Sequence, residues 1–468
     1  MSLSKLVLKA PRQIQLPLRY ALSVIPAPIR FGRSFRQTSG LLDDTEFLDR
    51  GRLLEYQSDR LRELISHVYE NVPYYRETFD RLGLLPSDIR TVFDINKLPF
   101  LTKETLQART RDLIARNYRP SQLTYVTTGG STGIPLGLYE ESGVTAGIER
   151  AFIAKQWSRV GYRIGDRTAV FRGSVVSNSN NERLWEYNPL EYSLVFSSYH
   201  LTEDRIPQML KRLRRFKPLF IQAYPSSIYL ISEYMRKSGA APIPSVKAVL
   251  CGSENLYDFQ RESIAEAFQC RVFSWYGHSE KAVLAGECEY SSQYHVFPEY
   301  GIAELIGPGD RPVKEEGEAG EIIATGLNNF VFPLIRYRTM DLATQGARSC
   351  ECGRNHPLLK SVEGRLQELI VSRTGRYICM AALNMHSAVF EHVKQFQFFQ
   401  DEPGKVTLKL VRREGYTEDD SIGIRRELGV KLGDDFGLAL DFVNEIPRTA
   451  SGKYRFADQR IPLMYGDR

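Results

Sequence analysis

Four polar segments of this 468-residue chain have residue types and spacings suited to phosphate chemistry. The first follows a predicted strand, and its glycines let backbone N–H groups and hydroxyls close around an anion. It is not a Walker loop, because no Gly-Lys-Ser/Thr ends it, nor a dinucleotide fingerprint, because its glycine spacing differs. We expect a phosphate loop, with an ordinary surface turn as the alternative. Its residues are Thr128, Gly129, Gly130, Ser131, Thr132 and Gly133.

The second segment follows another predicted strand, at residues 271–275, so its side chains would emerge at the carboxyl end of a sheet, where open α/β folds bind ligands. It consists of Tyr276, Gly277, His278, Ser279 and Glu280. The Glu280 carboxylate could hold a Mg²⁺ ion that bridges phosphate oxygens. The alternative is a glutamate that only caps or pairs at the start of the next helix.

Two further charged side chains complete this set. Asp341 follows an aromatic and basic strand end and could accept two ribose hydroxyls, or it could form a salt bridge with Arg336 or Arg338. Lys453 lies in a Pro/Ser/Gly-containing loop near the carboxyl terminus. Most such lysines are solvated, but one on a loop of this kind can enter an active site when a domain closes.

The elements that must position these residues alternate between strand-like and helical patterns, which favours an α/β fold of parallel sheets covered by helices. A helical entry region covers residues 45–84, and Thr102 is a candidate helix cap. Beyond Gly364 the patterns predict a small α+β unit of strands and one helix. We therefore expect an amino-terminal arm (1–44), a large domain (45–364) and a small mobile carboxyl-terminal domain (365–468). The strand-like runs cover 123–127, 167–171, 218–223, 246–250 and 271–275 in the large domain, and 368–371, 406–411 and 438–443 in the small one.

The overall composition excludes several classes of protein. A content of 42% hydrophobic and 25% charged residues is that of a globular chain. The net charge of +6 is spread over 118 charged side chains and does not by itself imply nucleic acid. No apolar run is long enough to span a bilayer. The six cysteines do not form a disulfide scaffold, and we expect a cytoplasmic protein whose broken amino-terminal segment packs on its own domain rather than on a membrane.

In this order, the segments resemble the adenylate-forming superfamily of acyl-CoA synthetases and adenylation domains. Within it the chain is most similar to the phenylacetate-CoA ligase branch and to CapK-type proteins associated with capsular polysaccharide genes. The similarity covers about residues 30–460. It is carried by the run at 57–75, Tyr224-Pro225-Ser226-Ser227, residues 252–256 and Cys352-Gly353-Arg354.

The resemblance implies a role for each segment. The loop at 128–133 would bind phosphates, Glu280 magnesium and Asp341 the ribose, and Lys453 would be the catalytic lysine. Ser253 and Glu254 would lie along the adenine, Tyr276 would stack on it, and Arg365 would lie at an interdomain hinge. An acyl pocket is expected from Tyr199, His200, Tyr224, Pro225 and Ser226.

The chain departs from the family pattern in three places: Ile134 replaces a common lysine, Gly129-Gly130 replaces a glycine-serine pair, and Met340 replaces the glycine before Asp341. A methionine resists backbone conformations that glycine accepts, so ribose binding could be altered.

A second metal is suggested by soft ligands on either side of the Asp341 segment. Cys288, His295, Cys350 and Cys352 could form a closed tetrahedral zinc site, or they could remain unligated.

The implied reaction is ATP- and Mg²⁺-dependent activation of a carboxylate as acyl-AMP, then transfer to coenzyme A by default. An amine or sugar acceptor, an inactive ATP-binding relative and a zinc-containing binding protein remain alternatives. We expect no nucleic-acid partner, and we allow for a homodimer.

Overall fold

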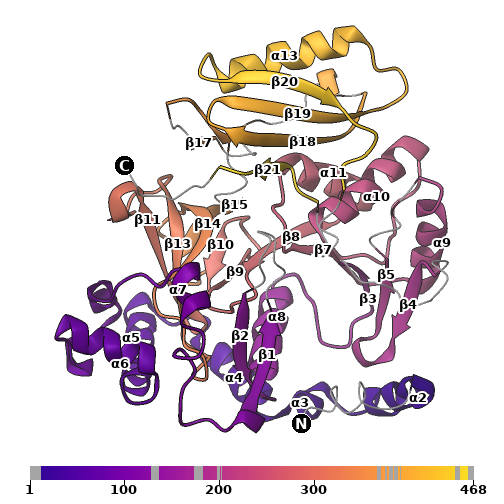
Figure 1. The fold of residues 1–468 in the computed structure, drawn as a ribbon. Helices are drawn as coiled ribbons and strands as arrows, with labels where there is room; N and C mark the ends of the chain where they lie inside the picture. The colour runs from indigo at the N-terminus through magenta and orange to yellow at the C-terminus, as the bar shows by residue number, and fades with distance from the viewer. Residues whose placement is uncertain are drawn as a thin grey trace.

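The computed structural model describes residues 12–127, 136–172, 183–197, 201, 203–365, 370–374, 377–378, 383, 388–390, 392–447 and 454–461. Figure 1 shows a large α/β domain with a smaller domain of strands and one long helix lying over it. The expected fold class is confirmed. Among the described residues no helix is long and apolar enough to cross a membrane. The helices are α2 (Arg12–Ser23), α3 (Ala27–Arg30), α4 (Gly32–Thr45), α5 (Arg50–Asn71), α6 (Pro73–Leu82), α7 (Lys103–Ala108), α8 (Thr145–Ser158), α9 (Ile206–Phe216), α10 (Pro225–Ser238), α11 (Asp258–Phe268) and α13 (Glu418–Leu432).

A thirteen-stranded sheet forms the framework of the large domain, in the order β12-β11-β13-β14-β15-β10-β9-β8-β7-β6-β3-β5-β4. One half, from β8 to β5, is parallel, and the rest is antiparallel. Its strands are β3 (Thr168–Phe171), β4 (Trp185–Asn188), β5 (Ser193–Phe196), β6 (Phe220–Ala223), β7 (Ala248–Gly252), β8 (Arg271–Gly277), β9 (Leu284–Gly286), β10 (Tyr294–Val296), β11 (Gly301–Gly307), β12 (Arg311–Pro312), β13 (Ala319–Gly326), β14 (Tyr337–Gln345) and β15 (Leu358–Arg365).

The parallel half follows from the predicted alternation of strands and helices. All five residues of β7 are buried, as expected for a central strand covered on both faces. One expectation was wrong: the run at 123–127 does not join this sheet. It forms β1 (Leu123–Thr127), which pairs antiparallel with β2 (Gly137–Glu141) in a separate hairpin. The short intervening sequence allows a hairpin, whereas a parallel pair needs a long crossover.

The helical entry region packs on the antiparallel half of the sheet. In α5, Leu61, Leu64, Ile65 and Val68 are fully buried and form one helical stripe. The helix begins at Asp49, whose carboxylate accepts the Arg52 N–H at 3.0 Å. These side chains share a core with residues of β11, β13 and β14.

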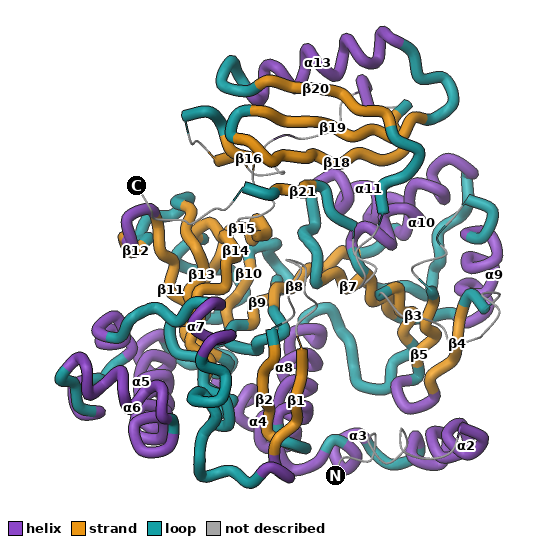
Figure 2. The backbone as a smooth tube through the Cα atoms, in the orientation of Figure 1, coloured by secondary structure: helices purple, strands orange, loops and turns teal. Residues whose placement is uncertain are grey.

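The small domain has its own core and its own four-stranded sheet, in the order β20-β19-β18-β21. The predicted helix is α13, which Figure 2 shows covering the outer face of this sheet. Its buried residues Ile424, Leu428 and Leu432 pack against Val406 and Leu408. The strands are β16 (Ile370–Val371), β17 (Tyr377–Ile378), β18 (Val393–Glu402), β19 (Lys405–Arg412), β20 (Gly437–Phe442) and β21 (Ala457–Gln459). The exact limits of the three predicted units stay predictions.

A buried ion pair holds the loop at 92–101 on the antiparallel half of the sheet. The Arg336 guanidinium donates to both oxygens of Glu304 at 2.9 and 3.0 Å and to the Leu98 carbonyl at 2.7 Å. Its side chain is only 7% exposed. Removal of one partner from such a pair leaves the other charge and the carbonyl unsatisfied.

We predict that Arg336→Met lowers the free energy of unfolding by about 3 kcal/mol, measured by urea denaturation. The control is Arg52→Ala. That variant breaks an ion pair whose side chains are 71% and 69% exposed, and it should change the value by less than about 0.5 kcal/mol. Equal effects of the two substitutions would contradict the structural role of Arg336.

Candidate active site

Four parallel strands end side by side, and a candidate functional residue follows each of them. The strands β3, β6, β7 and β8 are in register along this edge: Phe171 pairs with Ala223, Ala223 with Cys251, and Gly252 with Trp275. The carboxyl edge of a parallel sheet is where open α/β folds bind ligands. The structure thus brings together three groups of predicted residues from distant parts of the chain, namely Tyr224 to Ser226, Ser253 with Glu254, and Tyr276 to Glu280.

Arg172, which follows β3, is a member of this edge that the sequence analysis missed. Its guanidinium donates to the Ser253 hydroxyl and lies 5.5 Å from the ring centres of both Tyr224 and Trp275. Burial lowers the pKa of Arg172 from its usual range. Its position directly after a predicted strand, as for Tyr224 and Ser253, was the signal that could have identified it. It places a positive charge between the predicted acyl and adenine segments.

Glu254 connects this edge to the small domain. One carboxylate oxygen accepts the Ser226 N–H at 3.0 Å, at the start of α10, and the other accepts the Tyr454 N–H at 3.1 Å. The second bond joins the segment predicted to line the adenine to the residue that directly follows Lys453 in the sequence.

Aromatic rings extend this contact between the domains. The ring of Phe456 lies edge-on to Tyr257, with centroids 5.2 Å apart, and 6.5 Å from Phe259. Tyr257 and Phe259 stand at the start of α11 in the large domain, whereas Phe456 precedes β21 in the small one. The two domains therefore meet through a polar bond and an aromatic cluster beside the carboxyl edge.

Asp341 lies on β14, next to the end of β8. Its carboxylate accepts the hydroxyl of Tyr276 at 2.7 Å. Burial and the neighbouring carboxylate raise the pKa of Tyr276 well above its usual range, so the phenol stays neutral and donates. The salt bridges that were the alternative for Asp341 form elsewhere, because Arg336 pairs with Glu304 and Arg338 with Asp310 and Glu321.

Glu280 faces the same region from the turn after β8. One carboxylate oxygen accepts the hydroxyl of Tyr337 at 3.2 Å, and the other lies 3.3 Å from Nδ1 of His278. The next residue, Lys281, forms an ion pair with Glu140 of β2. This pair, which the sequence analysis also missed, ties the turn to the hairpin whose strands flank the predicted phosphate loop.

Several predicted residues lie outside the described residues: Thr128 to Gly133, Tyr199, His200 and Lys453. Arg365 is described by its backbone, which pairs with Asp341 between β15 and β14. Their proposed roles stay predictions.

Met340 adopts the backbone conformation that the family glycine suggested. Its φ angle is +64°, in the left-handed region that side chains with a Cβ disfavour. The backbone is held there by a hydrogen bond from the Met340 N–H to Glu321, at 3.2 Å. Burial raises the pKa of Glu321 to about 7. The methionine therefore preserves the irregularity in β14 that presents Asp341, at a cost in conformational strain.

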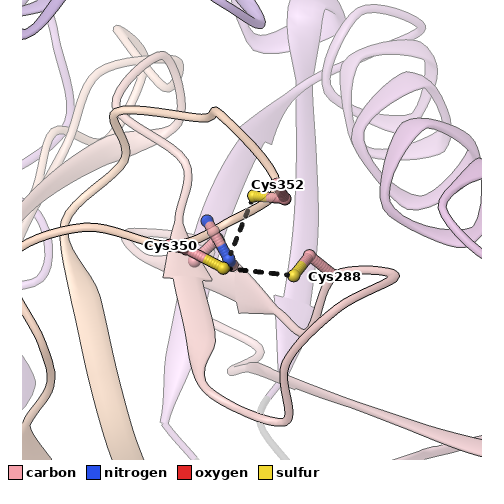
Figure 3. A group of neighbouring side chains, drawn as sticks. Cys288, Cys350 and Cys352 are labelled. Carbon is pink, nitrogen blue, oxygen red and sulfur yellow. Dashed lines mark hydrogen bonds between the residues drawn. The ribbon is translucent and has the colours of Figure 1, made fainter.

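The cysteine and histidine cluster is also assembled. Figure 3 shows the side chains of Cys288, Cys350 and Cys352 close together. The Cys288 and Cys350 sulfurs are 3.6 Å apart, and the Cys352 sulfur lies 3.7 Å from Nε2 of His295. All four potential ligand atoms lie within 4.8 Å of one another. In a tetrahedral site with Zn–S bonds of about 2.3 Å, sulfur atoms are about 3.75 Å apart, so the donor set and its spacing fit zinc.

Known proteins are similar to this chain over most of its length. A family model described as the CapK C-terminal domain matches residues 370–459. Protein CapK of Staphylococcus aureus is 25% identical over 414 residues, covering 87% of this chain and 90% of that protein. A phenylacetate-coenzyme A ligase of Thermus thermophilus is 26% identical over 419 residues, covering 84% and 87%.

Over most of its length the chain is similar to phenylacetate-CoA ligases and to CapK, and its carboxyl-terminal part matches the CapK C-terminal domain. The expected enzyme class, an adenylate-forming ligase, is thereby confirmed.

A solved 2-hydroxyisobutyryl-CoA ligase in its postadenylation state has the same fold, with a TM-score of 0.71 at 19% identity over 89% of this chain and 91% of that one. In its thioesterification state the same ligase gives a TM-score of 0.56 over 90% and 92% of the two chains.

We predict that Met340→Gly raises the free energy of unfolding by about 0.5–1 kcal/mol, because glycine accepts the positive φ angle without strain. Urea denaturation is the measurement. The matched control is Met340→Ala, which shortens the side chain but keeps the Cβ and the strain, and which should bring no gain. A loss of stability in the glycine variant would show that the methionine side chain matters more than its backbone.

Proposed function

We propose that this ligase uses ATP and Mg²⁺ to convert a carboxylic acid into its acyl-AMP, releases pyrophosphate, and then transfers the acyl group to coenzyme A. The observation that carries the proposal is the meeting of Tyr276, Glu280 and Asp341 at one sheet edge, beside the contact of Glu254 with the small domain. The Asp341 carboxylate, which accepts the Tyr276 hydroxyl, is suited to binding a ribose. The nearby Glu280 carboxylate is suited to binding a metal ion on a phosphate.

In the first step, a carboxylate oxygen attacks the α-phosphorus of ATP and the bond to the β-phosphate oxygen breaks. Glu280 would hold Mg²⁺, and the bound ion would supply positive charge to the pyrophosphate leaving group. Asp341 is proposed to bind the ribose hydroxyls, with its orientation fixed by Tyr276. The loop at 128–133 and Lys453 are assigned to the phosphates by family resemblance. The N–H groups of the loop and the ammonium group of Lys453 would stabilise the developing negative charge.

In the second step, the sulfur of coenzyme A attacks the acyl carbon and AMP leaves. Coenzyme A is proposed because the solved relatives with similar folds and several sequence relatives are named CoA ligases. The contact between Glu254 and Tyr454 would have to break if the small domain rotates between the two steps. The higher TM-score to the postadenylation state suggests that the described arrangement precedes that rotation.

The acyl pocket is proposed beside Tyr224 and Ser226, and Arg172 adds a cation to it. The carboxylate itself is best found by screening aromatic, hydroxy, amino and fatty acids.

We predict that a cognate acid, ATP and Mg²⁺ release pyrophosphate, and that Lys453→Ala lowers this rate by about 10²–10³-fold, because a charge-stabilising donor is lost. The assay couples pyrophosphate release to hydroxylamine trapping of the acyl-AMP. The control is Lys405→Ala, which removes a lysine that is 68% exposed in the same small domain and should leave the rate unchanged. Acid-dependent release that survives in Lys453→Ala would overturn the role of this lysine, and ATP binding without release for any acid would overturn the proposed activation.

We also propose that the cluster of Cys288, His295, Cys350 and Cys352 holds a structural zinc ion. Four protein ligands complete a tetrahedral shell and leave no position for a substrate. Backbone N–H groups of Tyr290 and Ser291 donate to the Cys288 sulfur at 3.4 and 3.3 Å and hold it in place. Such an ion would join the loop after β9 to the loop after β14.

We predict one zinc ion per chain by elemental analysis of the purified protein, and its loss in Cys350→Ser together with a lower melting temperature, because metal binding contributes to folding. The control is Cys270→Ser, which changes a cysteine outside the cluster, and this variant should keep the zinc. A metal-free wild-type protein that retains its stability would contradict the proposal.

A further inference from the structure

The amino-terminal segment has a charge imbalance that the rest of the chain lacks. Residues 1–42 contain seven lysines and arginines and no aspartate or glutamate. When these seven are taken from the chain's 62 basic residues, 55 remain, against 56 acidic residues. The net positive charge of the whole chain therefore originates in this one segment. Its basic residues are Lys5, Lys9, Arg12, Arg19, Arg30, Arg33 and Arg36.

The same segment exposes large apolar side chains. Within α2, α3 and their connection, Val24 is 79% exposed, Ile29 62%, Ile14 52% and Tyr20 50%. A single exposed isoleucine or valine is ordinary, but four large apolar side chains within 16 residues form a cluster. Pro17 and Pro28 in the same stretch are also exposed.

Contacts with the body of the protein hold this segment in place. In α4, Phe35 and Leu42 are buried, and Asp43 forms an ion pair with Lys155 of α8. Nearer the amino terminus, the Tyr192 hydroxyl donates to the Ser23 carbonyl at 3.3 Å. Figure 1 shows α2 and α3 along the side of the large domain opposite the small domain. The exposed apolar side chains therefore belong to an ordered, docked segment on the outside of the fold.

Arginines accompany the apolar residues on this outer surface. Arg33 and Arg36 are exposed and Arg19 is partly exposed, whereas Nε and Nη1 of Arg30 are buried and its guanidinium lies over the Phe31 ring. An amphipathic, basic segment of this kind lies in the plane of a lipid interface, with its apolar side chains among the acyl boundaries and its arginines at the headgroup phosphates. Nucleic acid would satisfy the arginines but would leave Val24 and Ile29 in water.

We propose that residues 12–36 dock this ligase peripherally on an anionic membrane surface, with Val24 and Ile29 inserted into the interface. Most of the attraction at a distance comes from the arginines, and it falls off within a Debye length. The bound orientation keeps the small domain on the face away from the lipid, where it can move. The sequence analysis expected this segment to pack on its own domain rather than on a membrane. The proposal departs from that expectation, because one side of the segment packs and the other side remains for lipid.

The test is co-sedimentation of the full chain with vesicles of phosphatidylcholine, alone or mixed with phosphatidylglycerol. We expect binding to the mixed vesicles, little binding to the neutral ones, and a decrease at high salt. Val24→Glu/Ile29→Glu should lower binding by about tenfold or more, since two apolar contacts are lost and two negative charges face the lipid. Arg33→Gln should lower it roughly fivefold.

The matched control is Ile422→Glu/Val430→Glu in α13, whose side chains are 58% and 83% exposed and lie in the small domain. It should bind vesicles as the wild type does. Thermal unfolding of each variant shows that its fold is intact. The proposal is overturned if the wild type ignores anionic vesicles, if both double variants lose binding equally, or if Val24→Glu/Ile29→Glu binds vesicles normally. It is also overturned if a short duplex DNA binds the segment more tightly than the vesicles do and is unaffected by that double substitution.

Discussion

Strand β8 is the element on which the rest of the site depends, because it pairs with the parallel half of the sheet on one side and the antiparallel half on the other. Close packing fixes its position. A Cβ atom on Gly252 of β7 would lie only 2.5 Å from the Trp275 indole, so only glycine lets the two strands pair here. With this register, Tyr276 reaches Asp341 on β14, and the following turn presents Glu280. A bulkier residue at 252 would push β7 away from β8 and so separate the residues that follow β7 from those that follow β8.

In the described part of the chain, the small domain meets the site through polar and aromatic contacts that can break and re-form. A hydrogen bond from Tyr454 to Glu254 and edge-on aromatic packing around Phe456 join it to the large domain. Among the described residues, the small domain has a hydrophobic core of its own, against which Tyr257 of the large domain packs. A domain held in this way can rotate as a unit without unfolding.

Met340 stands where relatives have glycine, yet its backbone has the positive φ angle that glycine accepts more readily. The positive φ angle persists although glycine is gone, because the N–H of this residue bonds to the buried Glu321 and its neighbours belong to a paired strand. The surrounding hydrogen bonds outweigh a strain of about 1–2 kcal/mol. The substitution is therefore compatible with an intact position for Asp341.

The sequence by itself determined the fold class, most of the strands of the parallel half and the helix of the small domain, because these depend on local periodicity and on residue type. The tertiary structure decided which strands pair and which side chains contact one another, since the local pattern does not predict these. The run at 123–127 has the composition of any strand, and only the course of the chain made it a hairpin rather than a member of the main sheet. Likewise, the partners of Arg172 and Lys281 lie on segments distant in sequence. Asp341 bonds to Tyr276 rather than to either of the arginines near it in the sequence. The local pattern cannot predict such partners, because they depend on distance in space and not along the chain.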